Sequence, residues 1–181
     1  LSNMIDVIDT PNPDTKKFVF DKIIVSKGSK EFKKKDGTVS VVDELFNIGK
    51  IELIFLDKNF ISIRKSKDTS WENLTQNILD LLSKNIKKDF TPLTFEEETE
   101  FTDDVSIRIE EVLNEKIRPA VAMDGGDIRL KSFKNGVAEV MLKGACAGCP
   151  SSTITLKHGV ERMIKHYVPE VISVEAININ D

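Results

Sequence analysis

The chain has 181 residues, of which 40% are hydrophobic and 31% are charged, a balance typical of soluble globular proteins. Its formal net charge of −4 at pH 7 argues against a nucleic-acid-binding protein, because such proteins need a basic face to displace counterions from phosphates. No apolar stretch approaches the roughly 20 residues of a membrane-spanning helix, so we expect no membrane protein.

The first 90 residues predict a small domain of mixed α/β structure. A polar, extended start leads into Thr10-Pro11-Asn12-Pro13-Asp14, which is rich in turn-forming residues. The elements expected after it are a strand over 18–25, an exposed loop over 26–38, a helix over 41–48 that Gly49 ends, and a β-hairpin of 51–56 with 60–64.

A capped amphipathic helix is predicted to begin at Asp68-Thr69-Ser70 and to end near residue 87. Its apolar face includes Trp71, which we expect to anchor the helix in the core. Residues 91–103 then change character, since they are acidic and show little periodicity. We interpret them as a linker between one domain over 1–90 and another over 104–181.

The second domain is predicted to have the order α-β-β-α-β. Apolar residues recur with helical spacing over 105–117, and Pro119 indicates that this helix stops or kinks nearby. Asp124-Gly125-Gly126-Asp127 predicts a sharp turn into a second hairpin, 128–133 with 137–142. A helix and a last strand over 171–177 complete an α+β fold class with two small domains.

Cys146 and Cys149 are the only cysteines, and they form a C-x-x-C sequence between the second hairpin and the last helix. Pro150 suits the first position of that helix, where its missing N–H costs nothing. Cys149 would then lie near the N-cap, where the helix dipole favours a thiolate. The pair is therefore predicted to ligate a soft metal or to react as thiols in a reducing compartment, because cysteines this close cannot staple a secreted fold.

Other candidate residues in this domain have simpler explanations. The last helix is expected to bury one face, consisting of Leu156, Val160, Met163, Ile164 and Tyr167. His158 and His166 lack a partner at zinc-ligand spacing and are expected at the surface or at the helix end. Asp124 and Asp127 flank two glycines, so forming the turn explains them better than acid–base catalysis does.

The segments 124–127 and 144–152 resemble the C-terminal domain of NifU-type (Nfu) iron–sulfur scaffold and carrier proteins, and the start at Thr10-Pro11-Asn12-Pro13 resembles their N-terminal domain. The resemblance implies a binding and delivery protein without enzymatic turnover, in which Cys146 and Cys149 ligate an iron–sulfur cluster. The implied cluster is 4Fe-4S, with 2Fe-2S as the second possibility. The implied partners are the upstream cluster assembly machinery and apo iron–sulfur proteins as acceptors, in a bacterial cytoplasm or, in a eukaryote, the mitochondrial matrix.

The number of ligands that a cluster takes leads us to expect a second chain. A cubane cluster or a tetrahedral metal takes four ligands, and one chain supplies two thiolates. We therefore expect a homodimer in which a cluster joins two protomers. The small residues Ala145, Ala147 and Gly148 should leave the loop open, and neither thiol is expected to be a core residue.

Two other functions are compatible with the cysteine pair. C-x-x-C at a helix start also occurs in thioredoxin-like dithiol oxidoreductases, although here a hairpin rather than a βαβ unit precedes it and Pro150 follows the second cysteine. A dimer supplying four sulfurs could instead hold structural zinc. An absorption spectrum of anaerobically purified protein separates the three functions.

Overall fold

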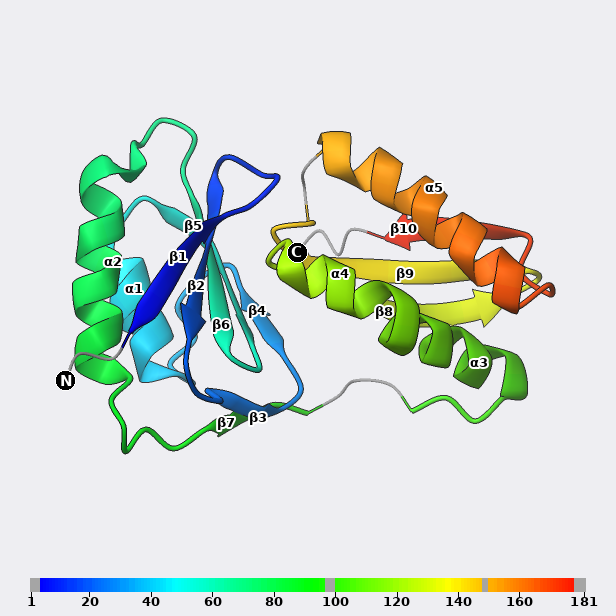
Figure 1. Cartoon of the computed structure of the whole chain (residues 1–181), viewed down its shortest axis with the longest axis horizontal. Helices are drawn as coiled ribbons and strands as arrows, with labels where there is room; N and C mark the ends of the chain where they lie inside the picture. The colour runs from blue at the N-terminus through cyan, green and yellow to red at the C-terminus, as the bar shows by residue number, and fades with distance from the viewer. Residues whose placement is uncertain (1–3, 97–99, 148–149, 178–181) are drawn as a thin grey trace. The chain divides into compact units, whose positions relative to one another are not determined.

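The computed structural model describes residues 4–96, 100–147 and 150–177, without the side chains of 150–155. The chain divides into two compact units, Leu1–Glu97 and Glu98–Asp181 (Figure 1). Their boundary falls within 91–103, the stretch interpreted as a linker. Each unit has its own cluster of buried apolar side chains.

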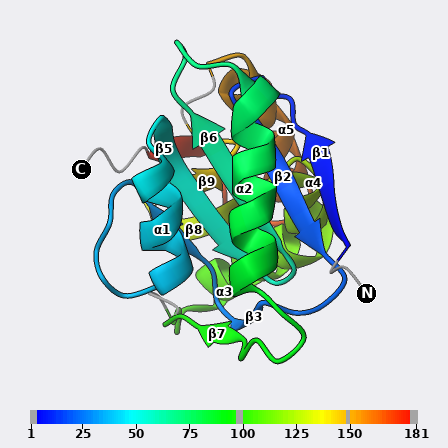
Figure 2. The ribbon, with the colours of Figure 1, turned by 90° about the vertical axis from the view of Figure 1, so that its left-hand side faces the viewer.

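The N-terminal unit is a sheet with helices on one face. Its elements are β1 (Ile5–Asp9), β2 (Thr15–Phe20), β3 (Val25–Lys27), β4 (Lys30–Phe32), α1 (Ser40–Ile48), β5 (Ile51–Asp57), β6 (Phe60–Lys65), α2 (Trp71–Asn85) and β7 (Leu93–Thr94). In its described residues, an antiparallel sheet runs β1-β2-β6-β5-β4, and β3 pairs with β7 in parallel. Both helices lie over the same face of the larger sheet (Figure 2).

The predicted hairpin of β5 and β6 is confirmed, and its alternation explains the core. Ile54 and Leu56 on β5 face the helices together with Ile61 and Ile63 on β6, and all four are buried in the apolar cluster. Residues two apart on a strand point to the same side, so these four form a continuous apolar surface. The predicted α1 is also confirmed, and it ends at Gly49, whose φ of +80° suits a residue without a Cβ.

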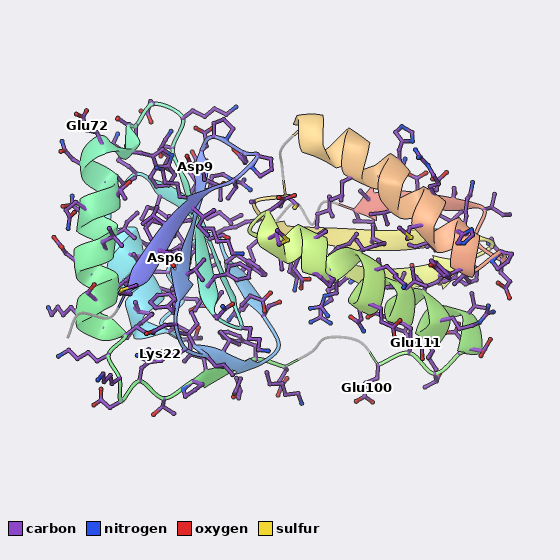
Figure 3. The ribbon with its side chains drawn as sticks, in the orientation of Figure 1. Asp6, Asp9, Lys22, Glu72, Glu100 and Glu111 are labelled. Atoms are coloured by element: carbon purple, nitrogen blue, oxygen red, sulfur yellow. The ribbon has the colours of Figure 1, made fainter. Side chains whose placement is uncertain are left out.

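Both ends of α2 are satisfied by side chains. Ser70 Oγ accepts a hydrogen bond from the backbone N–H of Glu72 at 3.2 Å, and the Glu72 carboxylate lies in the first turn. The Lys22 ammonium donates to the carbonyl oxygens of Ile86 and Lys87 beyond the other end. Figure 3 shows Glu72 and Lys22 at these opposite ends. Negative charge at the start and positive charge at the end both oppose the helix dipole and stabilise the helix.

The segment Thr10–Asp14 is fastened to the start of α2. Asn12 Oδ1 accepts a hydrogen bond from the Asp14 N–H at 3.0 Å, and Asp14 Oδ1 accepts one from the buried Lys65 ammonium at 2.8 Å. The indole N–H of Trp71 donates to the Pro13 carbonyl at 3.0 Å. Trp71 is half-buried against the core, so the predicted anchor also holds this turn in place.

Three short strands of this unit were missed by the sequence prediction. β1 and β4 are edge strands of five and three residues, and they lie in segments interpreted as a polar start and a loop. β7 lies in the predicted linker, where Leu93 and Phe95 pack against the N-terminal core. The predicted strand over 18–25 is instead β2 and β3. Such short strands depend on pairing with a neighbour, which local sequence does not reveal.

We predict that the chain cut after residue 97 folds into a more stable N-terminal fragment than the chain cut after residue 90. The longer fragment keeps β7 and the apolar contacts of Leu93 and Phe95, which together contribute on the order of 2 kcal/mol as partly buried side chains. Urea unfolding followed by fluorescence of Trp71, the only tryptophan, measures the difference. Equal stability of the two fragments would contradict the assignment of residues 91–96 to this unit.

The C-terminal unit has helices on one face of a three-stranded sheet. Its elements are α3 (Asp104–Val112), a π-helical turn η1 (Leu113–Ile117), α4 (Arg118–Met123), β8 (Gly126–Lys134), β9 (Val137–Gly144), α5 (Pro150–Tyr167) and β10 (Ser173–Ile177). In the described residues β9 is central, antiparallel to β8 and parallel to β10. The order agrees with the predicted α-β-β-α-β arrangement.

The first helical segment is interrupted close to Pro119, as the sequence predicted, and it resumes as α4. α3 begins with Asp103 Oδ2 accepting the Ser106 N–H at 2.9 Å, a bond that lowers the pKa of this carboxyl. Regular α-helical bonding gives way to the π turn over 113–117, and α4 then carries Pro119 near its start. Proline cannot donate to a carbonyl one turn back, and the wider turn accommodates this loss.

A glutamate from the covering helices binds each edge strand of this sheet. Glu110 Oε1 on α3 accepts the Leu130 N–H of β8 at 2.9 Å, next to a bulge between Leu130 and Ser132. Glu161 Oε2 on α5 accepts the Val174 N–H of β10 at 3.0 Å. Unpaired N–H groups on edge strands can recruit other chains, so these carboxylates both join the layers and protect the edges.

Glu161 predicts a pH-dependent stability of the C-terminal unit. The bond from Val174 N–H lowers the pKa of the Glu161 carboxyl, and Lys165 Nζ at 3.3 Å contributes further. Because the folded-state pKa lies below the unfolded value of about 4.3, the stabilisation is present above that pH and is lost as pH falls through the folded-state pKa. The destabilisation caused by Glu161→Gln should therefore be measurable at pH 7 and nearly vanish at pH 3.

NMR-monitored urea unfolding at the two pH values measures this difference. Glu111→Gln is the matched control, since Glu111 is exposed on α3 (Figure 3) and should change stability at neither pH. If Glu161→Gln destabilised the unit equally at both pH values, its carboxylate charge would not be the cause.

Candidate metal centre

Cys146 lies in a turn over 145–147, directly after β9. The Ala147 N–H donates to the Gly144 carbonyl at 3.1 Å and closes this turn. α5 begins at Pro150, as the sequence predicted, so the backbone N–H groups at its start are close in sequence to the second cysteine. Cys149 itself lies outside the described residues.

Cys146 is a core residue, which corrects the expectation that neither thiol would be one. Only 6% of the residue is exposed, and it belongs to the apolar cluster of the C-terminal unit. Ala138 and Val140, which precede it by even numbers of residues on β9, belong to the same cluster. The turn therefore leaves Cys146 on the helix-covered side of the sheet, instead of directing it to solvent as small neighbouring residues suggested.

Cys146 packs against the turn at 124–127, which we call the glycine seat. The Ala145 N–H donates to the Gly125 carbonyl at 3.1 Å. Gly126, the first residue of β8, pairs with Gly144, the last residue of β9. A Cβ atom at position 126 would lie 2.6 Å from Cys146 Sγ and 2.8 Å from the Lys143 carbonyl oxygen. Position 126 therefore has no room for a side chain. The sequence predicted a turn here but not this contact.

Asp127 fastens the seat to the preceding helix. Its side chain is 3% exposed, and its two oxygens accept bonds from Arg118 Nε at 2.8 Å and Nη2 at 3.2 Å. Arg129 Nε lies 3.3 Å from Asp127 Oδ2, and Arg118 Nη1 donates to Asn114 Oδ1 at 2.7 Å. A buried carboxylate needs such partners, since isolated burial of its charge is very costly. Sequence spacing gave no sign that Arg118 would reach Asp127.

Among the described residues, the other predicted side chains do not join Cys146 in a metal-binding cluster. His158 and His166 are exposed on α5, as expected, and Asp124 is exposed while Asp127 is buried. In 4–96, 100–147 and 150–177, no three His, Cys, Asp or Glu side chains come together in a way that could hold a metal ion. The described part of the site thus offers one sulfur ligand, with Cys149 as the candidate for a second.

The inner face of α5 differs in part from the prediction. Val160 and Ile164 are buried and Leu156 packs against the core, but Met163 and Tyr167 are 37% and 47% exposed. Val168 completes the buried stripe, because it continues the four-residue spacing of Val160 and Ile164. Among the described residues, no helix is both long and apolar enough to span a membrane.

Both units are similar to known protein families. Residues 5–89 match the family described as the N-terminal domain of scaffold protein Nfu/NifU, and residues 109–175 match the family described as the NifU-like domain. The two matches cover the two compact units in order. Cys146 and Cys149 both fall within the second match.

Several curated proteins are similar over nearly the whole chain. NifU-like protein C1709.19c of Schizosaccharomyces pombe is 33% identical over 92% of this chain and 69% of its own length. The protein named NFU1 iron-sulfur cluster scaffold homolog, mitochondrial, is 33% identical in Homo sapiens, over 96% of this chain and 71% of its own length. The protein of the same name in Drosophila persimilis is 34% identical over 97% of this chain and 66% of its own length.

Solved structures match parts of the chain. The solution structure of a NifU-like protein from Saccharomyces cerevisiae is 22% identical, covers 47% of this chain and 79% of its own, and has a TM-score of 0.42. The crystal structure of protein SAV1430 from Staphylococcus aureus is also 22% identical, covers 43% of this chain and 96% of its own, and has a TM-score of 0.40.

The contact between Gly126 and the Cys146 sulfur generates a prediction about both. Gly126→Ala should destabilise the C-terminal unit by about 1–3 kcal/mol, because a methyl group forced into a filled space displaces its neighbours. It should also expose the Cys146 thiol, so that alkylation by iodoacetamide, mapped by mass spectrometry, becomes faster at this residue. NMR-monitored urea unfolding gives the stability change.

Gly159→Ala is the matched control. A Cβ at position 159 has no heavy atom within 4 Å, so this change should leave Cys146 alkylation as it is. It should stabilise the unit by about 1 kcal/mol, since alanine is the better helix former. Unchanged alkylation in Gly126→Ala would contradict the close seating of the sulfur.

Proposed function

Because the chain belongs to the NifU-like (Nfu) iron–sulfur scaffold family, we propose that it binds an iron–sulfur cluster through Cys146 and Cys149 and delivers it to apo iron–sulfur proteins. The observation that carries the proposal is the placement of Cys146 on a glycine seat, just ahead of the helix that begins after Cys149. The cluster is cargo, and the protein carries it without catalytic turnover.

The number of ligands that a cluster takes determines how many chains the loaded protein contains. The chain has two cysteines, whereas a 4Fe-4S cluster binds four thiolates. Two chains, each giving Cys146 and Cys149, supply the full set around a two-fold axis. A 2Fe-2S cluster also takes four ligands, so counting iron distinguishes the two cargoes. A shared cluster has ligands that an acceptor's thiolates can replace one at a time, which suits delivery.

Cys146 has to uncover its sulfur to reach a cluster shared with a second chain. The turn at 145–147 is held through the Ala147 N–H, which bonds within the turn, and the Ala145 N–H, which bonds to Gly125. Gly144 and Gly125 flank these bonds with φ values of +66° and +80°, which glycine adopts without steric cost. We place the required movement in this turn, with β9 and α5 staying fixed.

The cellular setting follows from the same proposal. A cluster carrier receives its cargo from upstream assembly machinery and passes it to acceptors, and its thiols require a reducing compartment. The human and Drosophila relatives carry the word mitochondrial in their names. Of the two compartments that the sequence left open, we therefore propose the mitochondrial matrix.

The proposal predicts that either cysteine substitution abolishes loading. After anaerobic reconstitution, the unaltered protein should show a broad visible band and about two irons and two sulfides per chain, the count for one 4Fe-4S cluster per two chains. Cys149→Ser and Cys146→Ala should show neither. Alanine is chosen at position 146 because a hydroxyl placed in that apolar cluster would add a desolvation cost.

Ala147→Ser is the control, because it adds a hydroxyl to the same turn without removing a sulfur, and it should load fully. A stoichiometric cluster on either cysteine variant would show that the ligands are misassigned. Colourless protein that purifies with zinc, or metal-free protein that cycles a disulfide between Cys146 and Cys149, would replace the carrier with one of the two other functions.

A further inference from the structure

Helix α5 has two opposite stripes with different character. Val160 and Ile164 are buried in the core, and Val168, directly after the end of the helix, continues their four-residue spacing. His158, Arg162 and His166 repeat with the same spacing two positions earlier, which is about 200° around the helix, and all three are exposed. The second stripe therefore lies on the face turned away from the core of the C-terminal unit.

The outer stripe concentrates positive and imidazole groups in an otherwise acidic chain. Both histidines of the protein lie on α5, and the helix has three cationic residues against one acidic residue, in a chain of net charge −4. Lys157 and Lys165 each form an ion pair at 3.3 Å, with Glu175 and Glu161. Among the described residues Arg162 forms no ion pair or side-chain hydrogen bond, so its guanidinium can bind an external carboxylate.

Gly159 leaves a small gap, here called the notch, on the outer face of α5. The fold does not require glycine at this position. Its φ is not in the left-handed region, and a Cβ there would have no heavy atom within 4 Å. Glycine inside a helix is nevertheless about 1 kcal/mol less favourable than alanine. Met163 lies one turn further on and is 37% exposed, which places a flexible apolar side chain beside the notch. A missing side chain lets another backbone approach closely.

We propose that His158, Gly159, Arg162, Met163 and His166 form a docking surface for a carboxylate-bearing segment of a protein acceptor. Arg162 supplies a planar fork for bidentate binding of a carboxylate, and Gly159 with Met163 accepts the apolar side of the same segment. One guanidinium and two imidazoles fit a single carboxylate better than a phosphate polymer or an anionic membrane, because each of these needs a broader basic face. As an acceptor site, the surface rests on the proposed function.

Its position suits the transfer of a cluster. α5 begins at Pro150, directly after Cys149, and Gly159 lies about 14 Å further along the helix axis. A segment bound along this face would therefore lie on the helix that begins at the cysteine motif. In the proposed cluster delivery, this surface would select the acceptor protein, while the two cysteines hold the cluster.

The test is an NMR titration of the ¹⁵N-labelled, metal-free full chain with an apo bacterial-type ferredoxin, an acidic protein whose cysteines bind 4Fe-4S clusters. Amide shifts should change along 158–166, and the Kd should rise roughly tenfold for Arg162→Glu. Gly159→Gln should weaken binding severalfold while keeping or raising the thermal stability, because glutamine is a better helix former than glycine. Weaker binding by a more stable protein cannot come from a damaged fold.

Lys131→Glu is the matched control, since it reverses an exposed charge on β8 away from α5 and should leave the Kd within about twofold. Shift changes confined to other elements, no detectable binding, or equal weakening by Lys131→Glu would overturn the proposal. The readout does not involve a cluster. Loss of cluster loading would therefore count against the proposed function alone, and a failed titration against this surface alone.

Discussion

The C-terminal unit is organised by the contact between the Cys146 sulfur and the backbone of Gly126. A side chain at position 126 would overlap both the sulfur and the Lys143 carbonyl, so β8 can start here only with glycine. The next residue, Asp127, is locked between Arg118 and Arg129. Removing one partner from a buried ion pair generally costs about 3–5 kcal/mol. These contacts fix three elements relative to Cys146: helix α4, strand β8 and the end of strand β9.

The proposed cluster carrier would have to protect its thiol and also expose it. A thiol in an apolar cluster is shielded from reaction, whereas the proposed cluster would have to be reached by a second chain and then by an acceptor. The turn that holds Cys146 is tied to the 124–127 turn by the hydrogen bond from the Ala145 N–H to the Gly125 carbonyl. In the rest of the unit, the carboxylates of Glu110 and Glu161 bind the two edge strands to helices that also pack on the shared apolar core. We therefore expect the motion that uncovers the sulfur to stay within the turn.

Much of the fold could be predicted because its signals are local. Both hairpins show alternation, and the second closes with Asn135-Gly136, whose positive φ values suit a two-residue turn. The missed features depend on distant partners: β1 and β4 exist by pairing at sheet edges, and Asp127 is buried because Arg118 reaches it from another element. The burial of Cys146 was missed for the same reason, since its small neighbours say nothing about Gly126. Met163 and Tyr167 share helical spacing with the core yet fall on the flank of the buried stripe.

We propose that two chains share one cluster through Cys146 and Cys149, and native mass spectrometry can show this. The full-length chain is mixed with an equal amount of its ¹⁵N-labelled form and then loaded anaerobically. We expect species of two chains and one 4Fe-4S cluster, including the mixed pair at the statistical proportion of about one half, and single chains once the cluster is removed. A complete cluster on a single chain, in buffer free of small thiols, would contradict it.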